Sequence, residues 1–265
     1  MLNIGWFSSG RDEAARQLLQ AAQESIGKGK IQGEISFVFS DREPGESRES
    51  DLFFDLVNSY GIPLVCLSHR EYKALSLEGR GLGEGEAKQS QESWRLKYDR
   101  EVSRRIEKFG PDICILAGYM LIIGEELCQK YSMINLHPAP PSGPVGSWQE
   151  VIWKLIQDGV EEAGAMIHIV TPELDRGTVL SYCLFSIRTK PFDQYWQREE
   201  KDELFKLIRQ HELAREFPLI IFTLQALSQG KINIKDGEVI DAQGEAIDGY
   251  DLTEEINRAV EENLK

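Results

Sequence analysis

Asn135 and His137 lie two residues apart at the end of a short apolar run, in the stretch "MINLHPAPPSGP". If that run is a strand, its period of two puts both side chains on the same face. The prolines that follow stop a strand or a helix, so the pair opens into a loop. An amide can donate to a developing oxyanion, and an imidazole can donate or move a proton near neutral pH. The pair therefore predicts a site for attack on a carbonyl; a structural hydrogen bond made by His137 before a turn is the alternative.

Four further places offer candidate groups for a site. Asp175 in "ELDRGT" can hold a charged imidazole or order a water, although this sequence also favours a plain turn. His168 lies in an apolar run, where a core histidine is the simpler interpretation. A glycine-containing turn at 8–16 opens a helix, and Arg95 lies near the start of a later one. These residues are consistent with a hydrolase or an acyl-type transferase.

Alternating strand-like and helix-like segments must position these residues. Five apolar stretches are predicted to be strands: 3–9, 34–40, 62–68, 112–118 and 133–137. Segments with apolar residues at helical spacing lie between them. This alternation predicts an α/β fold with a Rossmann-like, mostly parallel sheet and helices on both faces. Ligands of such sheets bind beyond the carboxyl ends of the strands, which is where Asn135 and His137 lie.

The remaining segments are less regular. Residues 76–93 are rich in Gly, Glu and Ser and predict a loop or a locally disordered insertion. Two β-rich segments, 163–170 and 178–187, predict a hairpin-like pair of strands at the edge of the sheet. A long helix over about 198–229, a hairpin around "KDGEV" and a charged terminal helix follow.

Length and charge bound the organisation and the partners. The 265 residues suit a catalytic α/β domain over 1–190, with helices and a hairpin of 191–265 packed on the same domain. A net charge of −14, from 44 acidic and 30 basic residues, argues against binding nucleic acid or an anionic membrane. An anionic small molecule stays compatible, because a pocket can be locally positive on an acidic protein.

The cysteines and the N-terminus indicate a compartment. No CxxC spacing is present and the context is mostly apolar, so we expect free buried thiols and no structural metal site at Cys66, Cys114, Cys128 and Cys183. The N-terminus lacks the basic region and the apolar stretch of a signal peptide. No apolar run approaches the roughly 20 residues that span a bilayer. We therefore expect a cytoplasmic protein.

Three ordered motifs carry a family resemblance. "LAGYMLII", "INLHPAPP" and "GAMIHIVTPELDRGTVL" resemble the formyltransferases that use 10-formyltetrahydrofolate, and most closely the phosphoribosylglycinamide formyltransferases. The likeness extends over nearly the whole chain outside 76–93 and about the last fifteen residues. In that family the Asn and His of the N-x-H-P motif and the Asp of the LD-x-G loop are catalytic. Carried over by motif, these residues are Asn135, His137 and Asp175. The resemblance implies that an acceptor amine attacks the formyl carbon.

The resemblance also implies binding residues. The folate co-substrate would lie in an apolar cleft formed by Leu121, Ile122, Ile123, Val170, Thr171 and Pro172. The acceptor would be contacted by Gly10, Arg11, Asp12, Arg95, Pro138, His168 and Glu212. No metal is implied, and a monomer or a homodimer is expected, with a small amine and folate as partners.

The turn after the first strand departs from the family pattern. Phosphoribosylglycinamide formyltransferases carry a glycine-serine-asparagine turn that holds the substrate phosphate, whereas Asp12, Glu13 and Ala14 stand at the matching positions here. Two carboxylates at a helix start stabilise the helix but repel a phosphate. Arg11 offsets one of these charges, and Arg95 matches the phosphate-binding arginine of the family.

The predicted function is formyl transfer from 10-formyltetrahydrofolate to the amine of glycinamide ribonucleotide, a step of purine synthesis. One alternative is a formyltransferase for a different, non-phosphorylated amine such as an amino sugar, since the loop after His137 also differs from the family and lacks its lysine. Another is a folate-binding protein without transfer activity. The acidic charge and the helical segment after about residue 190 speak against a methionyl-tRNA formyltransferase.

Overall fold

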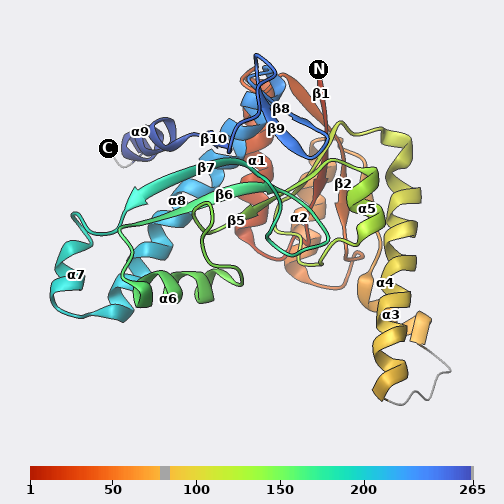
Figure 1. Cartoon of the computed structure of the whole chain (residues 1–265). Coiled ribbons are helices and arrows are strands. Elements are labelled where there is room, and N and C mark those ends of the chain that lie inside the picture. Colours follow the sequence, from red (N-terminus) through yellow and green to blue (C-terminus); the bar gives the residue numbers. More distant parts are fainter. Residues whose placement is uncertain (78–83, 264–265) are drawn as a thin grey trace. The chain divides into compact units, whose positions relative to one another are not determined.

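The computed structural model (Figure 1) describes residues 1–77 and 84–263. The contacts within the chain divide it into two compact units. Unit 1 comprises Met1–Lys28, Gln32–Ile134 and Val170–Pro172. Unit 2 comprises Gly29–Ile31, Asn135–Ile169 and Glu173–Lys265. The boundary falls inside one strand, β5 (Met133–His137), after Ile134.

The sheet of unit 1 confirms the predicted parallel arrangement. Its strands are β1 (Leu2–Phe7), β2 (Gly33–Ser40), β3 (Leu64–Cys66), β4 (Ile113–Leu116) and the start of β5. Their order is β5-β4-β1-β2-β3, with β1 parallel to β2 and β4, and β2 parallel to β3. The helices are α1 (Glu13–Gly27), α2 (Arg48–Ser59), α3 (His69–Leu77), α4 (Glu84–Ile106), a 3₁₀ turn (Glu107–Phe109) and α5 (Glu125–Lys130). The α/β class with a mostly parallel sheet is therefore confirmed.

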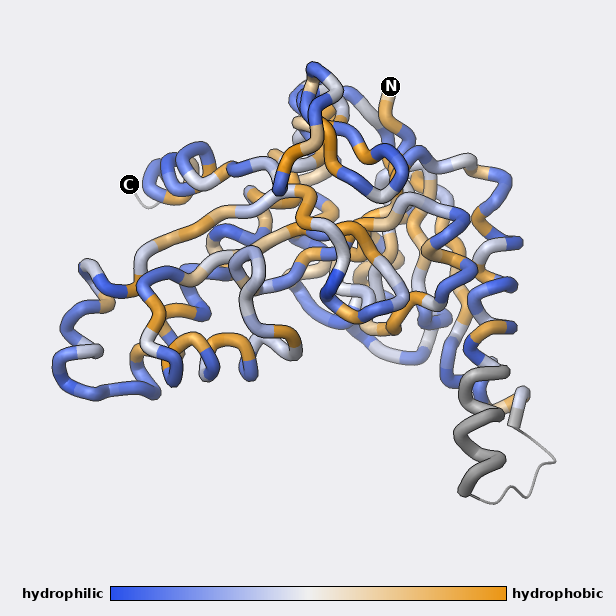
Figure 2. Tube along the Cα trace, viewed as in Figure 1, coloured by the Kyte–Doolittle hydropathy of each residue, from blue (hydrophilic) through white to orange (hydrophobic). Residues whose placement is uncertain are grey.

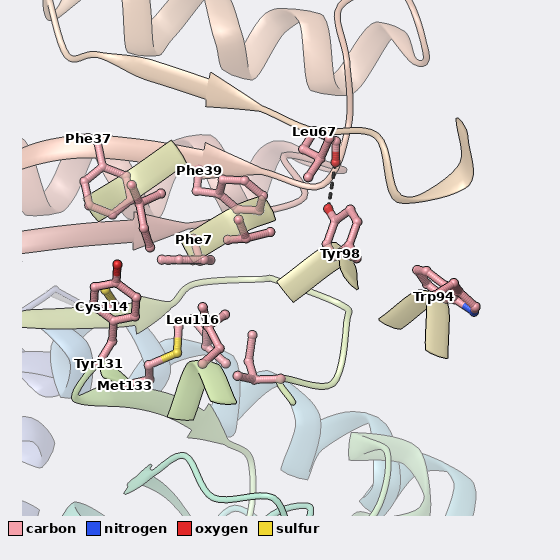
Figure 3. Close-up of a cluster of buried hydrophobic side chains, with 14 residues drawn as sticks. Phe7, Phe37, Phe39, Leu67, Trp94, Tyr98, Cys114, Leu116, Tyr131 and Met133 are labelled. Atoms are coloured by element: carbon pink, nitrogen blue, oxygen red, sulfur yellow. Dashed lines mark hydrogen bonds between the residues drawn. The ribbon is translucent and has the colours of Figure 1, made fainter. Parts of the chain in front are cut away.

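Apolar side chains of the strands and of α4 build the core of unit 1. Figure 3 shows Phe7, Phe37 and Phe39 of the sheet and Tyr98 and Trp94 of α4, all of them buried members of one cluster. The Tyr98 hydroxyl donates to the carbonyl of Leu67, the residue that follows β3, at 2.7 Å. Burying each such aromatic side chain contributes about 1.5–3 kcal/mol. This packing fixes the strand ends at which ligands of parallel sheets bind.

Residues 76–93 differ from the predicted loop. Ser76 and Leu77 end α3, and residues 84–93 form the first turns of α4, whereas 78–83 lie outside the described residues. The stretch "EAKQSQES" is rich in residues with good intrinsic helix propensity, which outweighs the glycines that precede it. The prediction of a loop was therefore wrong for 84–93.

Unit 2 is built around an antiparallel pair of strands. β6 (Glu162–Ile169) pairs with β7 (Val179–Ser186), as the sequence predicted. The order is β10-β7-β6-β5, because β10 (Tyr250–Asp251) adds in parallel to β7. The prediction that this pair forms the sheet edge was therefore wrong for β7. Two-residue strands such as β10 carry too little pattern to be found in a sequence.

Helices cover the strands of unit 2. They are α6 (Trp148–Asp158), α7 (Asp193–Gln197), α8 (Lys201–Ser228) and α9 (Thr253–Asn263). α8 contacts β6 and β7, and Ser181 on β7 lies 2.6 Å from Thr223 on α8, hydroxyl to hydroxyl. None of the helices within 1–77 and 84–263 is long and apolar enough to cross a membrane.

Local signals explain where two elements of unit 2 begin and end. α6 starts at a capping box between Ser147 and Glu150 and stops at Gly159, whose φ is +64°. Its apolar and polar residues alternate along the turns in Figure 2, as expected for a helix with one buried face. The hairpin of β8 (Ile232–Lys235) and β9 (Glu238–Asp241) turns at Asp236 and Gly237, both with positive φ.

Candidate active site

Strand β5 presents Asn135 and His137 as the alternation predicted. His137 is the last residue of the strand and is 3% exposed, whereas Asn135 is half-buried. A tight turn follows, in which the N–H of Ala139 donates to the carbonyl of His137 at 2.9 Å. The prolines after this turn end the strand, so both side chains lie at its carboxyl end.

Asp175 reaches the same place from the loop between β6 and β7. One carboxylate oxygen lies 3.6 Å from Nδ1 of His137 and the other lies 3.5 Å from Nε2 of His168. The backbone of Asp175 is left-handed, with φ of +53°, a conformation that Asp tolerates better than most residues. The loop therefore holds its carboxylate between two buried imidazoles.

Backbone carbonyls fix the second nitrogen of each ring. Nε2 of His137 lies 3.0 Å from the carbonyl oxygen of Pro144, and Nδ1 of His168 lies 3.0 Å from that of Ile169. A carbonyl oxygen only accepts, so each of these nitrogens carries a hydrogen. The remaining nitrogen of each ring faces Asp175, so a proton there is held by the carboxylate. Asn135 completes the cluster, its amide nitrogen 3.4 Å from Nε2 of His168.

The electrostatics keep Asp175 ionised. Burial opposes the charge, but a hydrogen bond from His168, the charges of His137 and His168, and the N–H of Gly146 outweigh burial and lower the pKa of the carboxyl. A carboxylate flanked by two imidazoles and an amide can stabilise an oxyanion, orient a water and accept a proton. This is the chemistry of acyl-group transfer.

Glu212 and Pro138 also belong to unit 2. Glu212 lies on α8 with no exposed surface, and the guanidinium of Arg209 is 3.6 Å away because it is bonded to Glu216 at 2.6 Å. Within the described residues neither carboxyl oxygen of Glu212 has a hydrogen-bond partner, and burial raises its pKa to about 9. The role of Glu212 toward an acceptor stays a prediction. Pro138 directly follows the catalytic histidine candidate in the same turn.

The residues predicted to hold a phosphate lie in unit 1. Gly10, with φ of +57°, makes the turn before α1, and Asp12 caps that helix by accepting from the N–H of Ala15 at 3.0 Å. Arg11 lies 3.7 Å from the Asp12 carboxylate. Arg95 donates to the carbonyl of Ile122. Both arginines and the helix N-terminus thus already have partners.

The predicted folate residues are also found in unit 1. Leu121 and Val170 pack against the same buried cluster, Ile123 is buried, and Ile122 is 52% exposed. The N–H of Val170 donates to a β5 carbonyl at 2.8 Å, which places Val170, Thr171 and Pro172 at the end of that strand. The exposed side chain of Ile122 and the half-buried ones of Leu121 and Val170 offer apolar contacts that suit the flat ring system of a folate. No group of ligands able to hold a metal occurs in the described part of the chain.

The loop after β5 contributes two functional groups that sequence reasoning missed. The carbonyl of Pro144 and the N–H of Gly146 hold His137 and Asp175, respectively. Both act through backbone atoms, so no side-chain type marks them. The only available signal is the density of Pro and Gly in "PAPPSGPVG", which restricts the backbone.

Comparison with known proteins connects this site to a family. The Formyl transferase family model matches residues 3–190. Phosphoribosylglycinamide formyltransferase of Escherichia coli is 33% identical over 90 residues, 32% of this chain and 41% of that protein. The enzyme of Saccharomyces cerevisiae is 29% identical over 123 residues, 43% of this chain and 58% of that protein. The chain thus matches about half the length of these two relatives.

Solved structures share the fold. Phosphoribosylglycinamide formyltransferase of Coxiella burnetii superposes with a TM-score of 0.68 at 22% identity, covering 94% of this chain and 98% of that one. A formyltetrahydrofolate deformylase of Pseudomonas syringae gives 0.56 at 20% identity, covering 91% and 65%. At these identities the likeness is one of fold, and the matched family model extends over most of the chain. The chain therefore belongs to the formyl transferase family.

Proposed function

We propose that the protein transfers a formyl group from 10-formyltetrahydrofolate to a primary amine, with glycinamide ribonucleotide as the first acceptor to test. The observation that carries the proposal is the position of Asp175 between the imidazoles of His137 and His168, with Asn135 beside them. Membership of the family and the similarity to phosphoribosylglycinamide formyltransferases support the reaction and the acceptor.

The proposed roles follow from the chemistry of each group. 10-Formyltetrahydrofolate supplies the formyl carbon to which the acceptor nitrogen adds. Asn135 donates a hydrogen bond to the oxygen that becomes negative, and His137 donates through Nε2 once that nitrogen exchanges the carbonyl of Pro144 for the substrate. Asp175 faces Nδ1 of His137 and takes up, through a water, the proton that the acceptor nitrogen loses. The same proton then passes to the folate nitrogen as its bond to the formyl carbon breaks, so charge and protons balance.

The test is steady-state formyl transfer, followed as tetrahydrofolate formation, for the wild type and for His137→Ala, Asn135→Ala and Asp175→Asn. Removing one donor to a developing oxyanion lowers kcat by about 10²–10³-fold. His69→Ala serves as the matched control, because His69 lies in unit 1 and pairs with Asp41 at 2.9 Å. Full activity of the His137→Ala variant would disprove the proposed mechanism.

The cap of α1 favours a second candidate, formyl transfer to an amine without a phosphate. The N-terminus of a helix after the first strand of such a sheet commonly binds an anion such as a phosphate. In this chain the Asp12 carboxylate already takes that place on α1. Comparing glycinamide ribonucleotide with the same molecule lacking its phosphate separates the two candidates. A preference for the ribonucleotide supports the first, and equal or better use of the riboside supports the second. Folate binding without turnover of either would indicate a binding protein.

A further inference from the structure

Unit 2 contains a cavity of about 810 Å³ beside the loop that follows β5. Pro140–Pro144 form one wall, the end of α6 another, and β7 contributes Tyr182 and Leu184. The volume lies within the range of small-molecule sites. Asn135, His137, His168 and Asp175 are not among its lining residues, so the cavity is distinct from the candidate active site.

The lining combines an apolar surface with acidic groups. Leu155, Val160 and Leu184 provide aliphatic contacts, and Tyr182 adds an aromatic ring. Such a surface accepts an apolar body of moderate size, and an aromatic ring also attracts a cation within about 6 Å of its centre.

The charges around the cavity favour a positive ligand. Four carboxylates line it, those of Asp158, Glu161, Glu162 and Asp248, against the cations of Lys154 and Arg176. Lys154 lies 2.7 Å from Asp158, so one of the two positive charges is already paired. Glu161 is 3.9 Å from Arg188, a loose contact between an exposed carboxylate and a half-buried guanidinium. With these two pairs set aside, Glu162 and Asp248 stand against the single cation of Arg176, which leaves a net negative charge at the cavity that an organic cation would complement.

The same loop connects the cavity to the catalytic candidates. Pro144 lines the cavity and its carbonyl accepts from Nε2 of His137 at 3.0 Å. Two residues later, the N–H of Gly146 donates to Asp175. A ligand that packs against Pro140–Pro144 therefore contacts the segment that sets the orientation of the His137 ring.

We propose that this cavity binds an organic cation, an amine carried on an apolar body of moderate size, and that its occupancy is transmitted to His137 through the loop 140–146. This inference does not depend on the proposed formyl transfer, since both binding and the response of His137 are measurable without folate.

Calorimetric titration of the full chain with three probes tests the binding. Tryptamine, tryptophol and indole-3-acetate share an indole ring and carry charges of about +1, 0 and −1 near neutral pH. We expect the affinities to fall in that order, with tryptamine at least about threefold tighter than tryptophol. Equal affinities of tryptamine and tryptophol would overturn the proposal.

Variants locate the site. Glu162→Gln and Asp248→Asn should each weaken tryptamine by about two- to fivefold and leave tryptophol unchanged, as expected for exposed ion pairs. Glu254→Gln is the matched control, because it removes one exposed carboxylate of α9 outside the cavity lining. An equal loss in Glu254→Gln would mean that tryptamine responds only to the net charge of the protein, which contradicts the proposed site.

Nuclear magnetic resonance of the histidine rings tests the transmission. Saturating tryptamine should shift the ring signals of His137, assigned with His137→Ala, while those of His69 in unit 1 stay in place. Unchanged His137 signals at saturation would overturn the transmission, and equal shifts of both rings would indicate a general rather than a local effect.

Discussion

Asp175 is the residue on which the two buried imidazoles converge. Its carboxylate lies 3.6 Å from His137 and 3.5 Å from His168, which is long for a hydrogen bond but short for two opposite charges. Asp175 therefore acts on both rings mainly through its negative charge. A substitution that keeps its shape and removes its charge separates these two contributions.

Asp175→Asn should lower stability at neutral pH and have less effect in acid. Because the pKa of Asp175 is lowered in the folded state, its contribution is present above the unfolded pKa of about 3.9 and is lost as the pH falls through the folded value. We expect a loss of about 1–2 kcal/mol at pH 7, measured by chemical denaturation. A loss of the same size at pH 3 would show that shape rather than charge matters.

His168 is expected to position Asp175 rather than to react. His168→Leu removes one partner of the carboxylate and leaves the other, so we expect kcat to fall by about tenfold, less than for His137→Ala. The pH profile of kcat distinguishes this role from a packing defect, because Asp175 then supports only His137. An unchanged profile with a lower kcat would indicate packing alone.

The N-terminus of α1 and the buried face of α8 each contain a carboxylate whose charge can be tested by substitution. The N-terminus of α1 is capped by Asp12, whose side chain combines a hydrogen-bonding role with a charge. On α8, Glu212 has no exposed surface and lies beside an arginine that is bonded to another carboxylate. At both positions, therefore, the side chain fits its place in the helix while its negative charge has a cost. At Asp12 the charge repels an anionic acceptor, and at Glu212 it opposes burial.

Asp12→Asn should keep the cap and remove the charge. Asn and Asp are equally good at this position, whereas Asp12→Ala should cost about 1 kcal/mol of unfolding free energy. If the acceptor carries a phosphate near α1, Asp12→Asn should also lower its KM by several-fold. Thermal denaturation and kinetics with glycinamide ribonucleotide measure both effects. Equal stability of Asp12→Ala and the wild type would contradict the capping role.

Glu212→Gln should stabilise the protein at neutral and alkaline pH. Burial raises the pKa of Glu212 to about 9, above its value in the unfolded chain. The folded state then binds the extra proton between these values, so stability falls as the pH rises, by about 1.4 kcal/mol per pH unit at most. Denaturation between about pH 5 and pH 9 should show a flatter profile for the variant than for the wild type. Parallel profiles would mean that Glu212 is ionised when folded.

The net charge of the whole molecule affects how fast a charged acceptor approaches it. A chain with a net charge of −14 repels anions at a distance, and salt screens this repulsion beyond about 10 Å at 0.1 M. The local charge of the acceptor site can differ in sign from the net charge of the chain. The salt dependence of kcat/KM therefore shows whether the net charge or the local charge dominates the approach of an acceptor.

Raising the ionic strength from about 0.02 to about 0.3 M should increase kcat/KM for glycinamide ribonucleotide and leave that for the neutral-sugar riboside nearly unchanged. Stopped-flow or steady-state rates at low substrate measure this. A decrease for the ribonucleotide would instead reveal a positive acceptor site, formed against the overall charge of the chain.

Local patterns in the sequence determined the α/β class, the strands that end in the candidate site and the pair Asn135 and His137. Period-two alternation, helix caps and turn residues act over a few neighbours, so they are readable one segment at a time. Only the tertiary structure decided that Asp175 lies between two imidazoles and that β10 covers the edge of β7. It also decided that Glu212 is buried beside Arg209, whose guanidinium is already bonded to Glu216. These features join residues far apart in the chain, and their free energies depend on distance and burial, which no local pattern records.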